Sequence, residues 1–188
     1  MRIGILGGTF NPVHKAHLKI AQTALKKICL DKVLFVPAYK PPHKAIEGKT
    51  PTKDRVSMLR LALKGYKKFS VCLFEINKKG TSYTIDTLKH LKKRYPKNTE
   101  LFFLFGSDQK ERFHTWKDHK KLLKLATFVA FKRPCSNKKK NEEFVQNISF
   151  KPMDISSKEV RKLIHKKKST SKQVPKTVIN YISQKQLY

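Results

Sequence analysis

Residues 2–17 read RIGILGGTFNPVHKAH, and this stretch indicates how the whole chain folds. It begins with a short apolar run at residues 2–6, which predicts a buried strand, and the run leads directly into Gly7 and Gly8. Two glycines at this place let the backbone approach a phosphate closely and present N–H donors to it. A helical spacing of apolar residues follows at about residues 14–29. The glycine pattern alone is weak evidence, since it is neither GxGxxG nor GxxxxGK(S/T). Strand, glycine turn, helix start and the pair His14 and His17 together predict a polyphosphate site, because the N-terminus of a helix favours anions.

The alternation of strand and helix continues along the rest of the chain. Further strands are predicted at residues 33–36, 69–74, 101–105 and 128–131, with a weaker one near 148–150. Helices are predicted at residues 52–64 with Thr52 as the cap, at 83–94, up to about 126, after Ser156 and from Pro175. Residues 101–105 contain no polar side chain, which is typical of a strand covered on both faces.

This pattern predicts an α/β fold, with a Rossmann-like, mostly parallel sheet and helices on both of its faces. No internal repeat and no linker-like stretch divides the sequence. We therefore expect residues 1–188 to form a single domain with a small C-terminal helical part. In such a fold, ligands bind at the carboxyl ends of the strands.

The composition is that of a folded and strongly basic chain. Hydrophobic residues make up 39% of it, including 12 phenylalanines, which is enough for one core. The formal net charge is +30, and only 7 of the 43 basic residues are arginine. The charge alone supports a nucleic-acid-binding protein, since neutralised phosphates release counterions. The lysines are spread over every segment without an RNA-binding or zinc-finger motif, so a solvated surface that attracts small anions is the favoured interpretation.

The cellular location is predicted from what the sequence lacks. No stretch approaches the roughly 20 apolar residues of a membrane span, and the first residues do not have the pattern of a signal peptide. Cys29, Cys72 and Cys135 are odd in number and far apart, so we expect buried free thiols rather than disulfides or metal ligands. These features predict a cytoplasmic protein with no membrane partner.

His14 and His17 are three positions apart and so share one face of the predicted helix. By themselves they fit either histidines that stabilise a helix start or donors to a phosphate. A zinc site would need further ligands, and no other His or Cys has a matching spacing. Ser156 and Glu159 form a capping box, which would also point a helix N-terminus at an anion. Trp116 fits either a core residue or a ring-stacking contact with a ligand.

Residues 7–17, GGTFNPVHKAH, resemble the (T/H)xGH-type signature of the nucleotidylyltransferase superfamily and are most similar to bacterial nicotinate-nucleotide adenylyltransferases. The resemblance runs from end to end. Residues 37–44 resemble the loop after the second strand of that family, and residues 82–88 resemble the segment that lines its nicotinate pocket. Residues 106–108 and 113–116 resemble its G-x-D and aromatic-Trp stretch. Residues 155–161 resemble its ISSTxxR motif, and residues 174–188 resemble its closing helix. Three positions depart from the family pattern: Asn11 replaces the usual Asp, Ala16 the usual Gly and Lys158 the usual Thr.

The resemblance implies an enzyme of NAD biosynthesis that joins ATP and nicotinate mononucleotide into nicotinate adenine dinucleotide and releases pyrophosphate. It implies Mg²⁺ on the phosphates of ATP, no metal site formed by the protein itself, and no nucleic-acid partner. Catalytic roles are implied for His14, His17 and Arg161. ATP-binding roles are implied for Gly7, Gly8, Thr9, Phe10, Gly106, Asp108, Ser156 and Ser157. Roles in binding nicotinate mononucleotide are implied for Lys44, Thr84, Trp116 and Lys117.

Two other functions share part of this pattern. Another transferase of the superfamily, such as a phosphopantetheine adenylyltransferase, would use the same histidines but leaves Tyr83, Thr84 and Trp116 unexplained. A dehydrogenase-like dinucleotide-binding protein is disfavoured, because the sequence lacks both GxGxxG and an acidic residue after the second strand.

Overall fold

The structure is a computed structural model that describes residues 1–42, 50–131, 145–148 and 153–188. In this part of the chain six strands form one parallel sheet in the order β3-β2-β1-β4-β5-β6. The strands are β1 (Arg2–Gly8), β2 (Lys32–Pro37), β3 (Phe69–Val71), β4 (Glu100–Gly106), β5 (Thr127–Phe131) and β6 (Val145–Ile148). The helices are α1 (Lys15–Lys27), α2 (Thr52–Leu63), α3 (Phe74–Lys78), α4 (Thr84–Arg94), the 3₁₀ helix η1 (Ser107–Thr115), α5 (His119–Leu125), α6 (Ser157–His165) and α7 (Lys176–Gln184). The predicted Rossmann-like α/β fold is confirmed.

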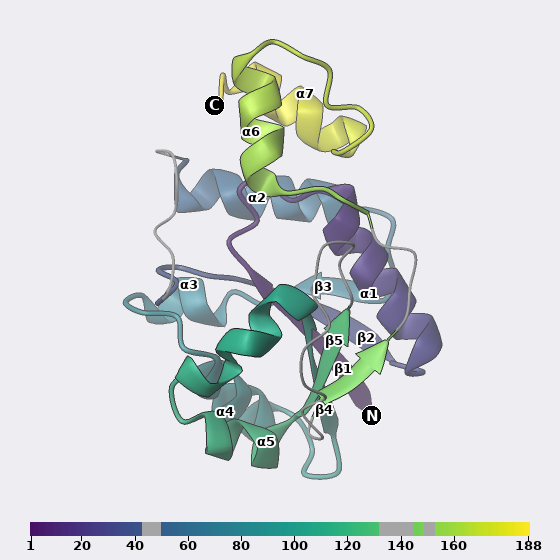
Figure 1. Ribbon diagram of the computed structural model, residues 1–188, viewed down its shortest axis with the longest axis vertical. Coiled ribbons are helices and arrows are strands. Elements are labelled where there is room, and N and C mark those ends of the chain that lie inside the picture. Colours follow the sequence, from purple (N-terminus) through teal and green to yellow (C-terminus); the bar gives the residue numbers. More distant parts are fainter. Residues whose placement is uncertain (43–49, 132–144, 149–152) are drawn as a thin grey trace.

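Helices cover both faces of the sheet (Figure 1). On one face Phe102 and Leu104 of β4 pack with buried residues of α1, α2, α6 and α7. On the other face Phe103 and Phe105 pack with buried residues of α4, α5 and η1. Successive side chains of a strand point to opposite faces. Residues 101–105 are apolar throughout because each side chain enters one of the two cores.

The strand order reverses at β1, which lies in the middle of the sheet. From β1 the chain moves outward to β2 and β3, and it then returns to β4 on the other side of β1. Gly4 accordingly pairs with Val33 of β2 and with Phe102 of β4. The carboxyl ends of β1 and β4, at Gly8 and Gly106, therefore lie at the point where open α/β sheets bind their ligands.

The C-terminal helical part lies beyond α2, at the end of the molecule towards which β1 runs (Figure 1). Tyr181 of α7 donates from its hydroxyl to Oδ1 of Asp54 at 2.8 Å, and Thr177 donates from Oγ1 to the main-chain O of Leu61 at 3.3 Å. Val178 of α7 enters the same core as α1 and α2. The helices α6 and α7 are thus packed onto the sheet layer through a shared core.

Three predicted element boundaries are wrong. The third strand ends at Val71, and a helix rather than a strand begins at Phe74, because a short apolar run does not distinguish a strand from a buried helix. The last strand covers Val145–Ile148 instead of 148–150, and residues 149 and 150 lie outside the described part of the chain. The helix α2 is capped by Pro51, so Thr52 is its first residue and not its cap.

The two glycines of the N-terminal motif also differ from the prediction. Gly7 and Gly8 continue β1 and pair with Val36 and Pro37, so the turn begins at Thr9 rather than at the glycines. The strand is longer than its apolar run because β2 extends equally far beside it. The sequence could not show this, since glycines after an apolar run fit both the last residues of a strand and the start of a turn.

The cysteines follow the prediction only in part. Cys72 is buried, but Cys29 is exposed. The reason is that α1 ends at Lys27 and the chain turns at Cys29, where the backbone is left-handed with a φ of 49°. Cys135 lies outside the described residues. In the part of the chain that the structure describes, no helix has the length and apolar character to cross a membrane.

Candidate active site

The loop between β1 and α1, residues 9–14, is held in place by α6. Arg161 on this helix donates from Nη1 to the main-chain O of Asn11 at 2.7 Å. Ser157, one turn earlier, donates from Oγ to the main-chain O of Pro12 at 3.0 Å. These bonds join residues 150 and 145 positions apart in the sequence. The guanidinium singled out near the end of the sequence therefore lies at the loop that leads to the two histidines.

The N-terminus of α6 meets the same loop. Ser156 is its cap, and its Oγ accepts from the backbone N–H of Glu159 at 3.1 Å, which is one of the two hydrogen bonds of the predicted capping box. Ser157 follows in the first turn and bonds to Pro12, so the open N–H groups of this turn lie beside the loop. The start of α1 is at the other end of the loop. Two helix N-termini, each favourable to an anion, therefore meet at residues 9–14.

His14 and His17 form one stacked unit at the start of α1. His14 is the cap of the helix, and its backbone N–H donates to Nδ1 of His17 at 3.2 Å. The two imidazole rings are 3.7 Å apart between centroids, with planes 24° apart. His14 is only 3% exposed, whereas His17 is half-buried. Because Nδ1 of His17 accepts a bond, a neutral His17 carries its proton on Nε2, which makes Nε2 a donor.

Phe10 sets the shape of the loop. Its backbone is left-handed with a φ of 48°, which is uncommon for a residue with a side chain. The ring is 1% exposed and contacts His17 edge-on at 5.0 Å and Phe35 at 5.9 Å between centroids. A Cβ added at Gly8 would lie 3.2 Å from this ring. A side chain at position 8 would therefore press on the Phe10 ring, which in turn contacts His17.

A second cluster lies at the start of α4. Thr84 is the first residue of this helix, and Tyr83 precedes it as the cap. Nζ of Lys117 lies 4.4 Å from the centre of the Tyr83 ring, so these two sequence segments are neighbours in space. Trp116 is half-buried and packs edge-on against Phe103, with 5.6 Å between ring centroids. The indole is therefore partly a core side chain.

The structure gives less information on three other predicted site residues. Gly106 ends β4 and caps η1, beside the carboxyl end of β1. Asp108 belongs to η1 by its backbone, and its side chain is outside the described part of the structure. Lys44 lies outside the described residues.

The chain matches known proteins over its whole length. Residues 5–163 match the model of the cytidylyltransferase-like family. A Shouchella clausii protein named "probable nicotinate-nucleotide adenylyltransferase" is 43% identical over 187 residues, which cover 100% of this chain and 96% of the relative. A Clostridium botulinum protein of the same name is 38% identical, with 100% and 98% of the two chains covered. The chain belongs to the nicotinate-nucleotide adenylyltransferase family.

Solved structures show the same fold. A Plasmodium falciparum nicotinic acid mononucleotide adenylyltransferase complexed with NaAD superposes with a TM-score of 0.81 at 23% identity, covering 100% of this chain and 97% of that chain. A putative nicotinate-nucleotide adenylyltransferase from Vibrio parahaemolyticus superposes with a TM-score of 0.72 at 17% identity, covering 97% and 92%. Identities this low show the likeness of the fold alone.

Arg55 is a residue of this adenylyltransferase-family chain that the sequence did not single out. It is 0% exposed, although it lies on a helix beside apolar residues. Its Nη1 donates to the main-chain O of Thr9 at 2.7 Å and of Ala38 at 2.9 Å, and its Nη2 donates to Oγ1 of Thr52 at 3.2 Å. Burial lowers the pKa of Arg55, but an arginine keeps its charge at neutral pH. Arg55 thus ties the first residue of the loop to the end of β2.

We expect Arg55→Met to lower the free energy of unfolding by about 2 to 4 kcal/mol, since buried carbonyl oxygens lose charged donors. Urea denaturation followed by circular dichroism measures the change. Arg60→Met is the matched control, because Arg60 is an exposed arginine on the same helix. Its expected change is within about 0.5 kcal/mol. Equal losses in the two variants would contradict the role of Arg55.

Tyr188 makes a further contact with the loop that the sequence did not predict. Its hydroxyl donates to Oδ1 of Asn11 at 2.5 Å. Burial raises the pKa of Tyr188 to about 12, against the opposite effects of a hydrogen bond with Thr50 and of the charges of Arg161 and Arg55. The phenol is therefore a donor at neutral pH. Asn11, where the family usually has Asp, accepts this bond through an amide oxygen without a negative charge.

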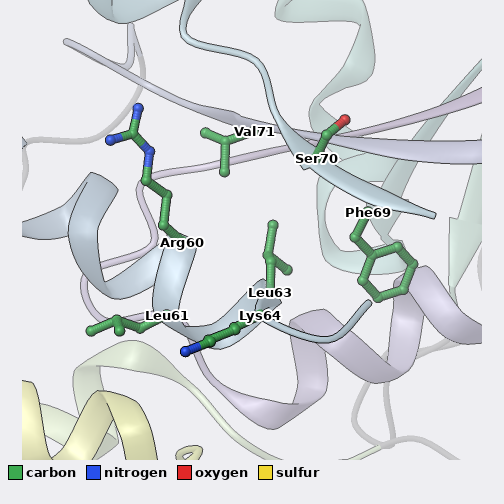
Figure 2. A pocket seen from close by; sticks show the side chains of 7 residues that line it. All are labelled: Arg60, Leu61, Leu63, Lys64, Phe69, Ser70 and Val71. Carbon is green, nitrogen blue, oxygen red and sulfur yellow. The ribbon is translucent and has the colours of Figure 1, made fainter. Parts of the chain in front are cut away.

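A surface depression of about 530 Å³ lies elsewhere, between the end of α2 and β3 (Figure 2). Its walls are formed by Arg60, Leu61, Leu63, Lys64, Phe69, Ser70 and Val71. β3 is the edge strand on the side of the sheet away from β4. None of the predicted site residues lines this depression, so we do not assign a substrate to it.

Proposed function

We propose that the protein transfers the AMP part of ATP to nicotinate mononucleotide, forming nicotinate adenine dinucleotide and pyrophosphate in NAD biosynthesis. The observation that carries the proposal is the match to nicotinate-nucleotide adenylyltransferases over the whole chain, together with Arg161, His14 and His17 gathered at one loop. In this reaction a phosphate oxygen of the mononucleotide attacks the α-phosphorus of ATP. A new P–O bond forms as the bond from the α-phosphorus to the oxygen of pyrophosphate breaks.

The reaction brings two anions together, so positioning and positive charge carry most of the rate. In our proposal Arg161 holds the β- and γ-phosphates with its planar fork. His17 donates from Nε2 to the phosphates, and His14, stacked beside it, stabilises the same charge. The other phosphate donors are the backbone N–H groups at Thr9 and Phe10 and the start of α6, with Ser156 and Ser157.

The carboxyl ends of the strands would hold the rest of ATP. Gly7 and Gly8 lie at the end of β1 and Gly106 at the end of β4, where open α/β sheets bind nucleotides, and we assign all three to the ATP side of the site. Asp108, which follows Gly106 in η1, is proposed to contact the nucleoside.

Mg²⁺ enters this scheme as part of the substrate. The residues that the structure describes contain no group of three or more His, Cys, Asp or Glu side chains arranged to hold a metal ion. Mg²⁺ is commonly held by substrate phosphates with one or two carboxylates rather than by an all-protein cage. We therefore assign it to the triphosphate, where it would neutralise part of the phosphate charge.

The start of α4 is the proposed site for the pyridine half of nicotinate mononucleotide. Backbone N–H groups near Thr84 and Lys117 would donate to the carboxylate. Trp116 would stack on the pyridinium ring with its exposed part, a cation–π contact of roughly 1–2 kcal/mol when desolvated. Lys44 is proposed as an additional cation on this side.

We expect nicotinate mononucleotide to exceed nicotinamide mononucleotide in kcat/KM by at least about tenfold. Donors at the carboxylate position favour the acid, because the NH₂ of the amide would face another donor and leave it unpaired. The measurement is the initial rate with each mononucleotide at saturating ATP. Comparable kcat/KM values would contradict the proposed contacts.

The function itself is tested by following pyrophosphate release from ATP and Mg²⁺ with each candidate acceptor. Release with nicotinate mononucleotide and not with phosphopantetheine is the expected result. Release only with phosphopantetheine would favour the sister transferase. Absence of release with every acceptor would overturn the proposal.

The basic surface and the compartment complete this proposal. A net charge of +30 creates a positive field that raises the local concentration of anionic substrates, without a nucleic-acid partner. Steep salt-dependent binding to duplex DNA in a filter assay would contradict the absence of a nucleic-acid partner. We place the reaction in the cytoplasm, since Cys29 and Cys72 are free thiols in the described part of the chain, as is typical of a reducing compartment.

A further inference from the structure

The residues that follow α7 turn back towards the rest of the molecule. The helix ends at Gln184, and the backbone at Gln186 is left-handed with a φ of 49°. The N–H of Gln186 donates to the main-chain O of Ser183 at 3.2 Å. The N–H of Leu187 donates to the main-chain O of Ile182 at 3.0 Å, and both side chains pack in the core that α1 and α2 share. These two bonds form a Schellman motif, which ends a helix and reverses the chain.

Tyr188, the residue after this reversal, reaches the loop between β1 and α1. Its hydroxyl donates to Oδ1 of Asn11 at 2.5 Å, and its ring packs against the same core. The acceptor is well shielded from water, because Asn11 is only 2% exposed. Burial raises the pKa of Tyr188 to about 12, so the phenol keeps its proton near neutral pH and remains a donor.

Asn11 is the position at which the supports of the loop meet. Its main-chain O accepts from Nη1 of Arg161 at 2.7 Å, and its side chain accepts from Tyr188. The preceding residue, Phe10, is 1% exposed and contacts the ring of His17 edge-on at 5.0 Å between centroids. A shift of the loop at Asn11 therefore reaches the imidazole of His17 through one buried ring.

We propose that Tyr188 is a positioning residue for the phosphate side of the active site: its phenol holds the loop at Asn11, so that His17 keeps its orientation towards the triphosphate. The inference rests on the proposed function, because that function assigns the triphosphate to residues 9–14 and α6. The start of α4, assigned to nicotinate mononucleotide, packs in the core on the other face of the sheet. Loss of the phenol therefore affects the use of ATP and leaves the binding of the mononucleotide intact.

The test compares Tyr188→Phe with Tyr181→Phe. Each variant loses one tyrosine hydroxyl from the C-terminal part, but Tyr181 donates to Oδ1 of Asp54 on α2 and not to the loop. We expect kcat/KM for ATP to fall about tenfold in Tyr188→Phe, the effect of one lost hydrogen bond to a buried partner, and to stay within about twofold of wild type in Tyr181→Phe. The KM for nicotinate mononucleotide should be unchanged in both. Equal losses in the two variants would overturn the inference, because the phenol would then support only the packing of the C-terminal part.

Two further backgrounds show whether the phenol acts through the loop. Adding Tyr188→Phe to Asn11→Ala or to His17→Ala should lower kcat/KM for ATP by less than about twofold, because the acceptor or the positioned imidazole is already absent. A full loss of about tenfold in the His17→Ala background would overturn the inference, since independent effects multiply in kcat/KM. That background decides the matter even if Asn11→Ala fails to fold.

Hydrogen exchange gives a readout that does not need turnover, because it reports the local opening of the backbone. Amides within residues 9–14 should exchange about tenfold faster in Tyr188→Phe than in the wild type, and at the wild-type rate in Tyr181→Phe. Unchanged exchange in Tyr188→Phe would overturn the inference even in an active enzyme. Faster exchange in a protein whose wild type shows no turnover would refute the proposed function and leave the phenol as a support of the loop.

Discussion

Replacing His17 with alanine is expected to lower the rate of pyrophosphate release about 100-fold, because the proposed role of its imidazole is that of a preorganised donor to a developing phosphate charge. The reason lies in the geometry of the loop. Nδ1 of His17 accepts the backbone N–H of His14, so the imidazole is held in one orientation with Nε2 as a donor. Stacking on His14 and the edge contact with Phe10 restrict the ring further. A donor fixed in this way needs no reorganisation during the reaction.

The measurement is kcat at saturating ATP and nicotinate mononucleotide, with thermal unfolding of both proteins recorded alongside. His165→Ala serves as the control, because His165 is an exposed histidine at the end of α6. It should keep the wild-type kcat. Near-normal turnover by a folded His17→Ala variant would falsify the role of the imidazole, and a large loss of thermal stability would point to a structural role at the start of α1.

The fold was predictable because its strands carry a strong local signal. Residues 101–105 and 128–131 are apolar without interruption, which is the pattern of strands buried on both faces, and Phe102 and Phe103 indeed belong to different cores. The helices were predictable where they are long and amphipathic, as in α1 and α4. Short helices were not predicted from the sequence. The helices α3 and η1 have five and nine residues, and neither length gives a clear hydrophobic period.

The site was predictable only where a motif is local. His14 and His17 share a face by spacing, and Ser156 caps α6 through Glu159 three residues later. The residues that hold the loop from a distance had no such signal. Arg55 is charged and lies in a helix, which predicts a solvent-exposed side chain, yet it is fully buried because three oxygen atoms surround its guanidinium.

The contact of the C-terminal residue Tyr188 with the loop could not be predicted either, because it has no local sequence signal. Tyr188 and Asn11 are 177 positions apart, and no periodicity or turn chemistry relates them. Glu75 likewise follows an apolar run that reads as a strand, so its place behind Thr87 depends on where that run leaves the sheet. Such pairs follow from the packed fold and not from the local sequence.

Arg161→Met is expected to lower kcat/KM for ATP about 100-fold, because the variant loses the planar cation that we propose as the group holding two phosphates. The guanidinium lies at the loop, bonded to the main-chain O of Asn11 at 2.7 Å, and the N-terminus of α6 lies beside it. Under the proposed role its loss removes positive charge from the leaving pyrophosphate, and it also breaks one hydrogen bond that supports the loop. Arg161→Lys separates these effects, because lysine keeps the charge without the fork.

If binding of the triphosphate depends on the fork, Arg161→Lys should remain severely impaired in kcat/KM for ATP, with the KM for nicotinate mononucleotide close to the wild-type value. If only positive charge matters, the lysine variant should recover most of the activity. Lys162→Met is the control, since Lys162 is exposed and its replacement removes the same charge from the same helix. A loss as large in Lys162→Met as in Arg161→Met would assign the effect to the general field of a chain with a net charge of +30 and not to a grip on the phosphates.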